Sequence, residues 1–376
     1  MKRFASKFPR ILLSLALAFS VIFASQISDV AVASTEATVT EPFKSPTIVG
    51  GDFVPSNNPI KYQVWLSVTF GNSSYACGGS LISQQWVITA AHCVSNDLAL
   101  AAASNILVYS GSNFRSTAAT STVSKVIRHK SYDPQKVVND LALIKLNTPL
   151  AFDDTRGAVS LPMDLPATWP QAGTSVLVSG WGIQSLVNQT IPNQIKSANI
   201  TVLSSPGSKA NCGWWTILNM YNPSQNLCAG SNDGSDICQG DSGGPYMVTT
   251  DGVQYLAGVT SFNAGTEYCG DSDYPGQAVR VTSFINWIVP AEPSGLSWSS
   301  KNNTYKVRWN KVTNSSAPTN GYVVQMSTDG GTNFGSGQFV KKTTLKINCS
   351  AGALCDFRVA AVSEVNQAYG PYNFTD

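Results

Sequence analysis

The sequence has little charge and almost no histidine. Charged residues make up 12% of its 376 residues and the net charge is +2, so nothing in the composition favours nucleic acid or an acidic membrane surface as a partner. Only two histidines occur and no cysteines have the Cys-x-x-Cys spacing, which argues against a zinc site. The chain is nevertheless 43% hydrophobic, so it can build a sizeable core, and its length suggests more than one domain.

Long apolar runs are absent after the N-terminus. Residues 11–24 form an apolar run behind a basic stretch, but this run is shorter than the roughly 20 residues that span a membrane. Small residues follow at 31–33, as in a signal-peptidase site. We therefore expect a signal peptide over residues 1–33, a pro-segment over residues 34–47 and a secreted, extracellular protein with no membrane span. Export would place the eight cysteines in an oxidising compartment, where an even number is typical of disulfides.

Many short β runs, such as residues 62–68, are separated by Gly, Asn, Asp and Pro over residues 48–290. This pattern predicts an all-β barrel or sandwich. The one good helix candidate, residues 283–289, ends the region, and Pro290 and Pro293 mark a boundary.

A second β pattern follows over residues 291–376, with runs at 305–309, 321–327 and 355–362. Its length and spacing fit a small, immunoglobulin-like β-sandwich. We therefore expect a second, separate β domain at the C-terminus.

Ser242 lies in Gly-Asp-Ser-Gly-Gly-Pro, residues 240–245. Glycines let the backbone turn tightly and approach a ligand closely, and two N–H groups aimed at one point can hold a developing oxyanion. Taken alone, the motif is as typical of a Gly/Ser-rich structural turn as of a nucleophile.

A nucleophilic serine also needs a base and a group that orients the base. His92 follows an apolar run and precedes Cys93; a buried packing histidine is the alternative reading. His129 lies between two cations, and we expect it on the surface. Asp140 leads directly into an apolar strand, so it must be paired or else cap the strand as a turn residue.

Four motifs occur in a fixed order: Ile-Val-Gly-Gly at 48–51, Thr-Ala-Ala-His-Cys at 89–93, Asp-Leu-Ala-Leu at 140–143 and Gly-Asp-Ser-Gly-Gly-Pro at 240–245. Together they resemble the trypsin/chymotrypsin family of serine proteases. The resemblance covers residues 48–290 and implies an all-β fold of two six-stranded Greek-key barrels. It implies a serine endopeptidase with no cofactor, and a loop over residues 110–125 without carboxylates gives no support for a calcium site.

The resemblance also implies roles for single residues. Ser242 would be the nucleophile, His92 the general base and then acid, and Asp140 the orienting group. The N–H groups of Gly240 and Ser242 would form the oxyanion hole, and Ser261 would lie beside the aspartate. The disulfides that the resemblance implies are Cys77–Cys93, Cys212–Cys228 and Cys238–Cys269.

Asp236 falls where the family has the floor of its specificity pocket, and an acid there would select Arg or Lys through a charge-assisted bond. A turn aspartate is the alternative. Three residues depart from the family pattern: Ile237 beside the floor, Asn263 on a wall that is usually glycine, and Ala278 where a tyrosine usually supports the floor. The implied pocket residues are Asp236, Ser261, Asn263 and Gly276.

Ile48 resembles the family's new N-terminus, which is created by proteolysis. Its ammonium would turn inward and pair with Asp241; a solvated turn residue is the alternative for this aspartate. Because Thr47 precedes the cut, we expect activation by a separate protease rather than by the enzyme itself.

Trp309, Tyr322 and Phe357 lie in segments that resemble a fibronectin type III module. Cys355 stands where that module has a corner tyrosine, and we expect a Cys349–Cys355 disulfide in its place. Such a module spaces or adheres, and its ligand is unknown.

We therefore expect a secreted, monomeric zymogen that cleaves proteins or peptides after Arg or Lys. The alternatives are a catalytically silent homologue that acts as a secreted binding or adhesion protein, and an active protease with non-basic specificity.

Overall fold

The computed structural model describes residues 48, 50–96, 99–183, 190–204, 212–288, 293–312, 319–363 and 373–374, all of which belong to the unit Lys44–Asp376. The expected signal peptide and pro-segment and the expected domain boundary at Pro290 lie outside these residues. No helix among the described residues has the length and apolar character needed to cross a bilayer.

The first half of the protease region closes into a six-stranded antiparallel barrel in the order β2-β3-β4-β7-β6-β5. Side chains alternate along a strand, so every second residue faces the barrel interior. In β2, Val64, Leu66 and Val68 are fully buried, whereas Trp65 and Ser67 are half-buried. The strands are β2 Gln63–Phe70, β3 Ser73–Leu81, β4 Trp86–Thr89, β5 Ile106–Ser110, β6 Ala119–Arg128 and β7 Ala142–Leu146.

The second half forms a sheet in the order β1-β9-β10-β13-β12-β11-β8, and an extra pairing of β9 with β8 closes six of its strands into a second barrel. β1 Asp52–Phe53 attaches to the outside through β9. The strands of the barrel are β8 Ser175–Gly180, β9 Lys196–Val202, β10 Asn226–Gly230, β11 Pro245–Thr250, β12 Val253–Phe262 and β13 Gly276–Arg280.

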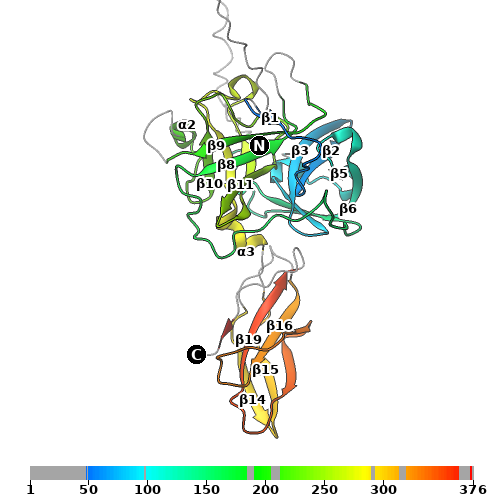
Figure 1. Ribbon diagram of the computed structural model, residues 1–376, viewed down its shortest axis with the longest axis vertical. Coiled ribbons are helices and arrows are strands. Elements are labelled where there is room, and N and C mark those ends of the chain that lie inside the picture. The colour runs from blue at the N-terminus through cyan, green and yellow to red at the C-terminus, as the bar shows by residue number, and fades with distance from the viewer. Residues whose placement is uncertain are drawn as a thin grey trace, which may run out of the picture. The chain divides into compact units, whose positions relative to one another are not determined.

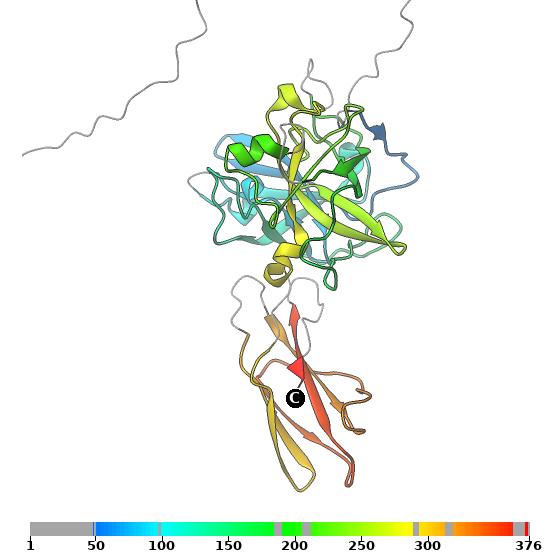
Figure 2. The same cartoon turned by 90° about the vertical axis from the view of Figure 1, so that its left-hand side faces the viewer.

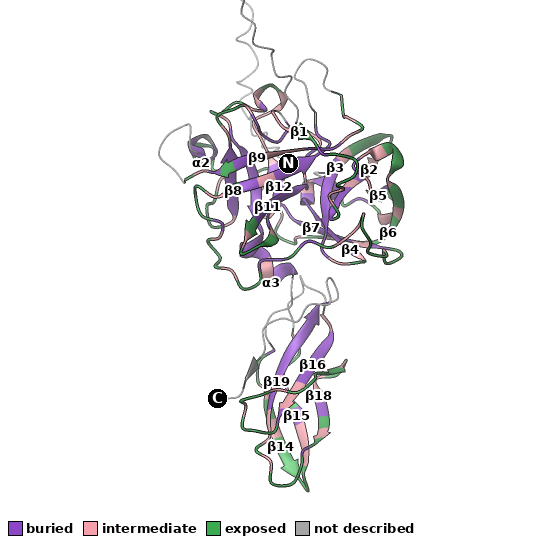
Figure 3. Ribbon diagram, viewed as in Figure 1, coloured by how far each residue is buried: buried purple, intermediate pink, exposed green. Residues whose placement is uncertain are grey.

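The two barrels lie side by side, the first in blue and cyan and the second in green and yellow (Figure 1, Figure 2). One core cluster joins them, because Met247 and Val259 of the second barrel pack with Trp86 and Leu143 of the first. Buried residues run through the strands of both barrels (Figure 3). The expected pair of six-stranded barrels is therefore confirmed.

The helices of the described residues are short. The expected helix at 283–289 overlaps a 3-10 turn, Val281–Phe284, which leads into α3 Ile285–Ile288, and residue 289 lies outside the described residues. The sequence patterns missed α1 Ala91–Val94 and α2 Trp214–Ile217, which span only four residues each.

The surface position expected for His129 is wrong. Its ring is half-buried and lies 5.5 Å from the Phe284 ring and 5.3 Å from the Trp287 ring. Burial and then the charge of Lys130 lower the pKa of His129, which disfavours its charged form, and the ring serves as a packing residue.

The C-terminal region has two antiparallel sheets, β14-β15-β18 and β17-β16-β19-β20. Their facing residues share one core, which includes Val307, Tyr322, Leu345 and Phe357. A disulfide joins Cys349 to Cys355, as expected. The strands are β14 Ser297–Lys301, β15 Thr304–Arg308, β16 Thr319–Ser327, β17 Gln338–Val340, β18 Thr344–Asn348, β19 Asp356–Ser363 and β20 Asn373–Phe374.

Candidate active site

His92 and Asp140 meet where two elements of the first barrel end. His92 lies in α1, directly after β4, and Asp140 directly precedes Leu141 and β7. The Asp140 side chain is fully buried, and its Oδ2 is 2.8 Å from His92 Nδ1. Its Oδ1 accepts a 2.8 Å hydrogen bond from the His92 backbone N–H. Ser261 Oγ donates to Oδ2 at 2.6 Å, so three donors satisfy the buried carboxylate and hold the imidazole in one orientation.

The electrostatics of this pair favour a protonated imidazole. Burial lowers the pKa of His92, but the charge of Asp140 and its hydrogen bond outweigh burial, so that the pKa lies above the usual 6.5. The buried carboxylate thus makes His92 a better proton acceptor than a free imidazole.

Ser242 lies at the junction of the two barrels. Its carbonyl accepts a 2.7 Å hydrogen bond from Gly78 N of β3, and the next N–H, of Gly243, donates to Thr260 O of β12 at 2.7 Å. Cys93 Sγ, next to His92, is 3.5 Å from the Ser242 carbonyl oxygen. In the described part of the chain the Ser242 hydroxyl makes no hydrogen bond with His92. Such contacts often tighten only when substrate binds.

Two N–H groups beside the serine are free to bind an anion. The N–H groups of Asp241, Gly243 and Gly244 all donate to carbonyls. Those of Gly240 and Ser242, by contrast, donate to no group of the described residues. Gly240 has φ +97°, a conformation that favours glycine. The turn therefore presents its two unused donors on either side of Asp241.

Asp236 is buried, and among the described residues its carboxylate has only backbone hydrogen-bond partners. Its Oδ1 accepts from Ile237 N at 2.7 Å and its Oδ2 from Gly276 N at 3.1 Å. Burial raises its pKa to about 8, despite these two hydrogen bonds. A Cβ on Gly276 would lie 2.8 Å from Asp236 Oδ1 and 2.5 Å from Ile237 Cγ1, so only glycine fits against the acid here.

Tyr246 fills space next to Ala278. A Cβ on Gly258, which lies between them, would be 3.0 Å from Ala278 Cβ and 3.2 Å from Tyr246 Cβ. The Tyr246 hydroxyl is fully buried and has no hydrogen-bond partner among the described residues. Burial, and then the charges of Asp236 and Asp241, raise its pKa, so the phenol stays protonated near both acids. Tyr246 of β11 and Ala278 of β13 therefore both lie against Gly258.

Asp241 and Ile48 are both buried. The Asp241 carboxylate accepts from Gly182 N at 2.7 Å and from Cys238 N at 3.0 Å, and burial raises its pKa to about 6. Ile48 is 1% exposed and packs with Ile237 and other residues of the second barrel core. No hydrogen bond joins Ile48 to Asp241 among the described residues. In an uncut chain the Ile48 nitrogen is an amide and carries no charge to offer the carboxylate.

Comparisons with known proteins agree with this geometry. The Trypsin family profile matches residues 48–288. The chain belongs to the trypsin family. Serine protease 1 of Canis lupus familiaris is 34% identical over 255 residues, which cover 67% of this chain and 93% of that protein. Trypsin of Sus scrofa is 35% identical over 243 residues, 64% of this chain and 94% of its own. Trypsin delta of Drosophila melanogaster is 34% identical over 244 residues, which cover 64% of this chain and 87% of that protein. This trypsin-family protein is a serine-type endopeptidase.

Three disulfides brace the site of this trypsin-family chain. Cys77–Cys93 links β3 to α1, Cys212–Cys228 holds β10, and Cys238–Cys269 joins the segment after Asp236 to the loop after β12. The structure brings the Cys77 and Cys93 sulfurs close to a His92 nitrogen. Because both sulfurs are in a disulfide, neither is a thiolate that could ligate a metal.

Gly182 has to be glycine because a Cβ there would collide with the Asp241 carboxylate. We expect Gly182→Ala to lower the free energy of unfolding by about 3 kcal/mol and to remove most of the activity, since the displaced carboxylate moves the neighbouring turn that carries Ser242. Chemical denaturation and a peptide assay measure both effects. Gly157→Ala is the control, because its Cβ would only touch Lys61 Cβ at 3.6 Å. Equal free energies of unfolding for Gly182→Ala and Gly157→Ala would contradict the requirement for glycine at position 182.

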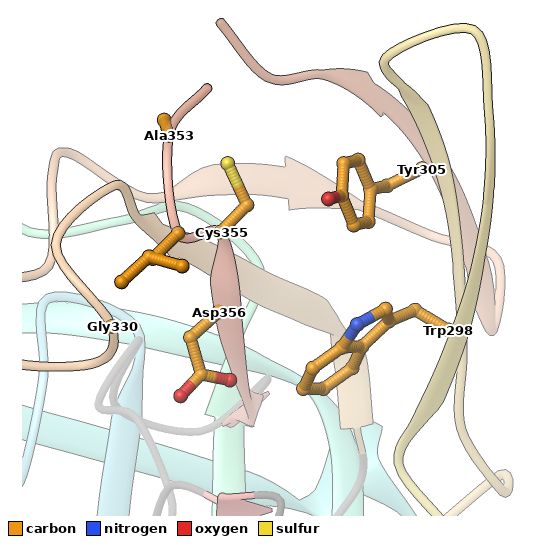
Figure 4. Close-up of a pocket in the computed structure, with 7 residues that line it drawn as sticks. Trp298, Tyr305, Gly330, Ala353, Cys355 and Asp356 are labelled. Carbon is orange, nitrogen blue, oxygen red and sulfur yellow. The ribbon is translucent and has the colours of Figure 1, made fainter. Parts of the chain in front are cut away.

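A pocket in the C-terminal region has Trp298 and Tyr305 on one side and Cys355 and Asp356 on the other (Figure 4). The two rings lie 5.1 and 5.3 Å from the buried Phe357 ring. They therefore support the core of this region as well as lining the pocket, and none of the protease residues belongs to it.

Sequence patterns missed three residues that shape the trypsin-family site. Gly182 donates to Asp241, Tyr246 lies near both buried acids, and Gln239 bonds to Asn263 at 3.1 Å. The Gly180-x-Gly182 spacing is the one local signal, because alternate glycines on a strand often mark a close backbone approach. Tyr246 and Gln239 carry no such signal.

Proposed function

We propose that the protein is a secreted endopeptidase, made as a zymogen, that cleaves after arginine through an acyl-enzyme on Ser242. The observation that carries the proposal is the hydrogen-bonded chain from Ser261 through Asp140 to His92, which lies beside the Ser242 turn and its two unused N–H groups.

In the proposed reaction, His92 Nε2 accepts the proton as Ser242 Oγ attacks the substrate carbonyl carbon. Asp140 accepts a hydrogen bond from His92 Nδ1–H, so the imidazole keeps the tautomer whose Nε2 carries no proton. The negative oxygen binds the N–H groups of Gly240 and Ser242, each of which stabilises it by roughly 3–4 kcal/mol. The C–N bond then breaks as His92 returns the proton to the leaving amine. In the second half, water attacks the acyl-enzyme carbonyl carbon while His92 accepts its proton, and the acid leaves as that proton returns to Ser242 Oγ.

Activity should rise with pH as His92 loses its proton. Because the pKa of His92 lies above 6.5, we expect kcat/KM for an uncharged substrate to rise through a midpoint above that value. A rising limb centred below 6.5 would mean that burial outweighs Asp140 in setting the pKa of His92.

Asp140→Asn should lower kcat by about 10⁴-fold, the size known for the same change in a related protease, because the imidazole takes the wrong tautomer. Ser261→Ala leaves Asp140 two hydrogen-bond donors and should lower kcat far less.

Basic specificity is supported by the burial of Asp236. A buried carboxylate without a charged partner is costly, and a guanidinium would supply two charge-assisted hydrogen bonds. The neighbouring Ile237 side chain offers no acceptor for the strongly hydrated ammonium of lysine, whereas a planar guanidinium is more weakly hydrated and matches the carboxylate through two parallel hydrogen bonds. We therefore infer a preference for arginine over lysine.

Zymogen activation is supported by Asp241 and Ile48. Asp241 is 1% exposed, and within the described ranges its carboxylate accepts hydrogen bonds only from backbone N–H groups. Cleavage of Thr47–Ile48 by another protease would create an ammonium close to the buried Ile48 side chain. Pairing with it would lower the pKa of Asp241 from about 6 and hold the oxyanion turn in place.

Fluorophosphonate labelling tests the proposal directly. We expect label on Ser242 in material whose N-terminus is Ile48, none in the uncut chain and none in Ser242→Ala. N-terminal sequencing identifies the start of the labelled form. Cleaved protein that takes no label would instead favour a silent homologue that works as a binding protein, and active material with a different N-terminus would refute activation at Ile48.

Secretion is supported by the four disulfides, which persist in oxidising compartments, and by the apolar run near the N-terminus.

The three-stranded and four-stranded sheets of the C-terminal region support a fibronectin type III-like module. Tyr322 contributes to its core and its hydroxyl accepts a 3.0 Å hydrogen bond from Val312 N.

A further inference from the structure

Two side-chain amides bridge the walls of the proposed specificity pocket. Gln239 belongs to the wall that carries Asp236 at one end and Gly240 at the other, and Asn263 directly follows β12 on the facing wall. Gln239 Nε2 donates to Asn263 Oδ1 at 3.1 Å. The bond therefore joins the walls between the oxyanion turn and the floor.

Asn263 is fixed by partners on both ends of its amide. Oδ1 also accepts from Gly265 N at 3.2 Å. Nδ2 donates to Ile237 O at 3.3 Å and to Cys269 Sγ at 3.2 Å. Because each amide atom has two partners, the side chain cannot swing aside without losing several of them at once.

In the proposed peptidase site, a long substrate side chain would meet the contacts of Asn263. The substrate carbonyl must sit at the N–H groups of Gly240 and Ser242, and its side chain must then pass between the walls to reach Asp236. The bond from Asn263 to Ile237 O crosses the walls only one residue from that floor. A side chain as short as alanine ends at Cβ and does not enter the gap.

We propose that Gln239 and Asn263 form a gate that selects against long side chains at the residue before the cut and opens only when such a side chain displaces the amide bridge. The inference rests on the proposed peptidase function of the same site. Breaking the bridge exchanges protein hydrogen bonds for contacts with the substrate, and a net loss of one hydrogen bond lowers affinity by about tenfold.

Three peptide substrates that differ only in the residue before the cut separate the gate from the floor. Arginine and norleucine are both long and unbranched, but only arginine is charged, and alanine is short. The ratio of norleucine to alanine in kcat/KM reports the gate, whereas the ratio of arginine to norleucine reports Asp236. Each ratio is measured on the activated full chain and on Asn263→Gly, Gln239→Ala and the double variant. Gln254→Ala, at the exposed start of β12, is the matched control.

We expect Asn263→Gly to raise kcat/KM about tenfold for arginine and norleucine alike, mainly through KM, and to leave alanine within about twofold. Gln239→Ala should act in the same direction with a smaller effect, and the double variant should gain no more than Asn263→Gly, because both changes break one bridge. An unchanged norleucine-to-alanine ratio in both single variants, or two gains that multiply, would overturn the gate. If the proposed specificity of Asp236 for basic residues is wrong, the arginine-to-norleucine ratio in kcat/KM will instead stay near one in every variant.

Discussion

Ser242→Ala is expected to lower kcat by about a million-fold, by analogy with removal of the nucleophile from another serine protease. Without Oγ no acyl-enzyme forms, and His92 has no hydroxyl from which to take a proton. The loss is so large because serine, base and orienting acid act as one unit rather than as three independent contributors.

The measurement compares the activated variant with the wild type on one chromogenic peptide, together with thermal unfolding. Ser242 is held through its backbone, by Gly78 N, rather than through its hydroxyl, so the melting temperature should not change. His92→Ala should cost a similar amount, and the double variant should lose no more than either alone. Losses that multiply would mean that the two residues do not share one step.

The strands and the triad candidates could be predicted because their signals are local. Alternation marks β2, and a histidine after an apolar strand or an acid leading into one is visible in a few residues of sequence. The contact between His92 and Asp140 has no local signal, since the two residues are 48 positions apart. Their approach follows from antiparallel pairing of β4 with β7, in which Thr89 lies opposite Ala142, and only the family resemblance indicated it in advance.

The errors and omissions arise from long-range packing. His129 was expected on the surface because its sequence neighbours are lysine and arginine, but its ring packs on Phe284 and Trp287 from the far end of the protease region. The bridge between Gln239 and Asn263 joins two irregular loops, which have no periodic pattern to reveal their contact.

Asp236→Asn should produce the second large effect, a loss of about 10⁴-fold in kcat/KM for the arginine substrate with little change for norleucine. The amide has nearly the same shape as the carboxylate, and its one oxygen can still accept from either the Ile237 or the Gly276 N–H. The other N–H loses its acceptor, which should lower stability without preventing folding. What is lost is the negative charge that faces the guanidinium. An arginine-to-norleucine ratio that survives the substitution would place the specificity elsewhere.

The pH dependence of that ratio tests the same carboxylate without a mutation. In the empty pocket burial raises the pKa of Asp236 to about 8, so at lower pH the free enzyme holds a proton there. A cationic side chain then binds only as this proton leaves, whereas norleucine has no such requirement. The arginine-to-norleucine ratio in kcat/KM should therefore rise by about tenfold per pH unit below that pKa and level off above it. Titration of His92 affects both substrates and cancels in the ratio. Asp236→Asn should make the ratio flat, and a ratio that is already flat in the wild type would mean that Asp236 is ionised before substrate arrives.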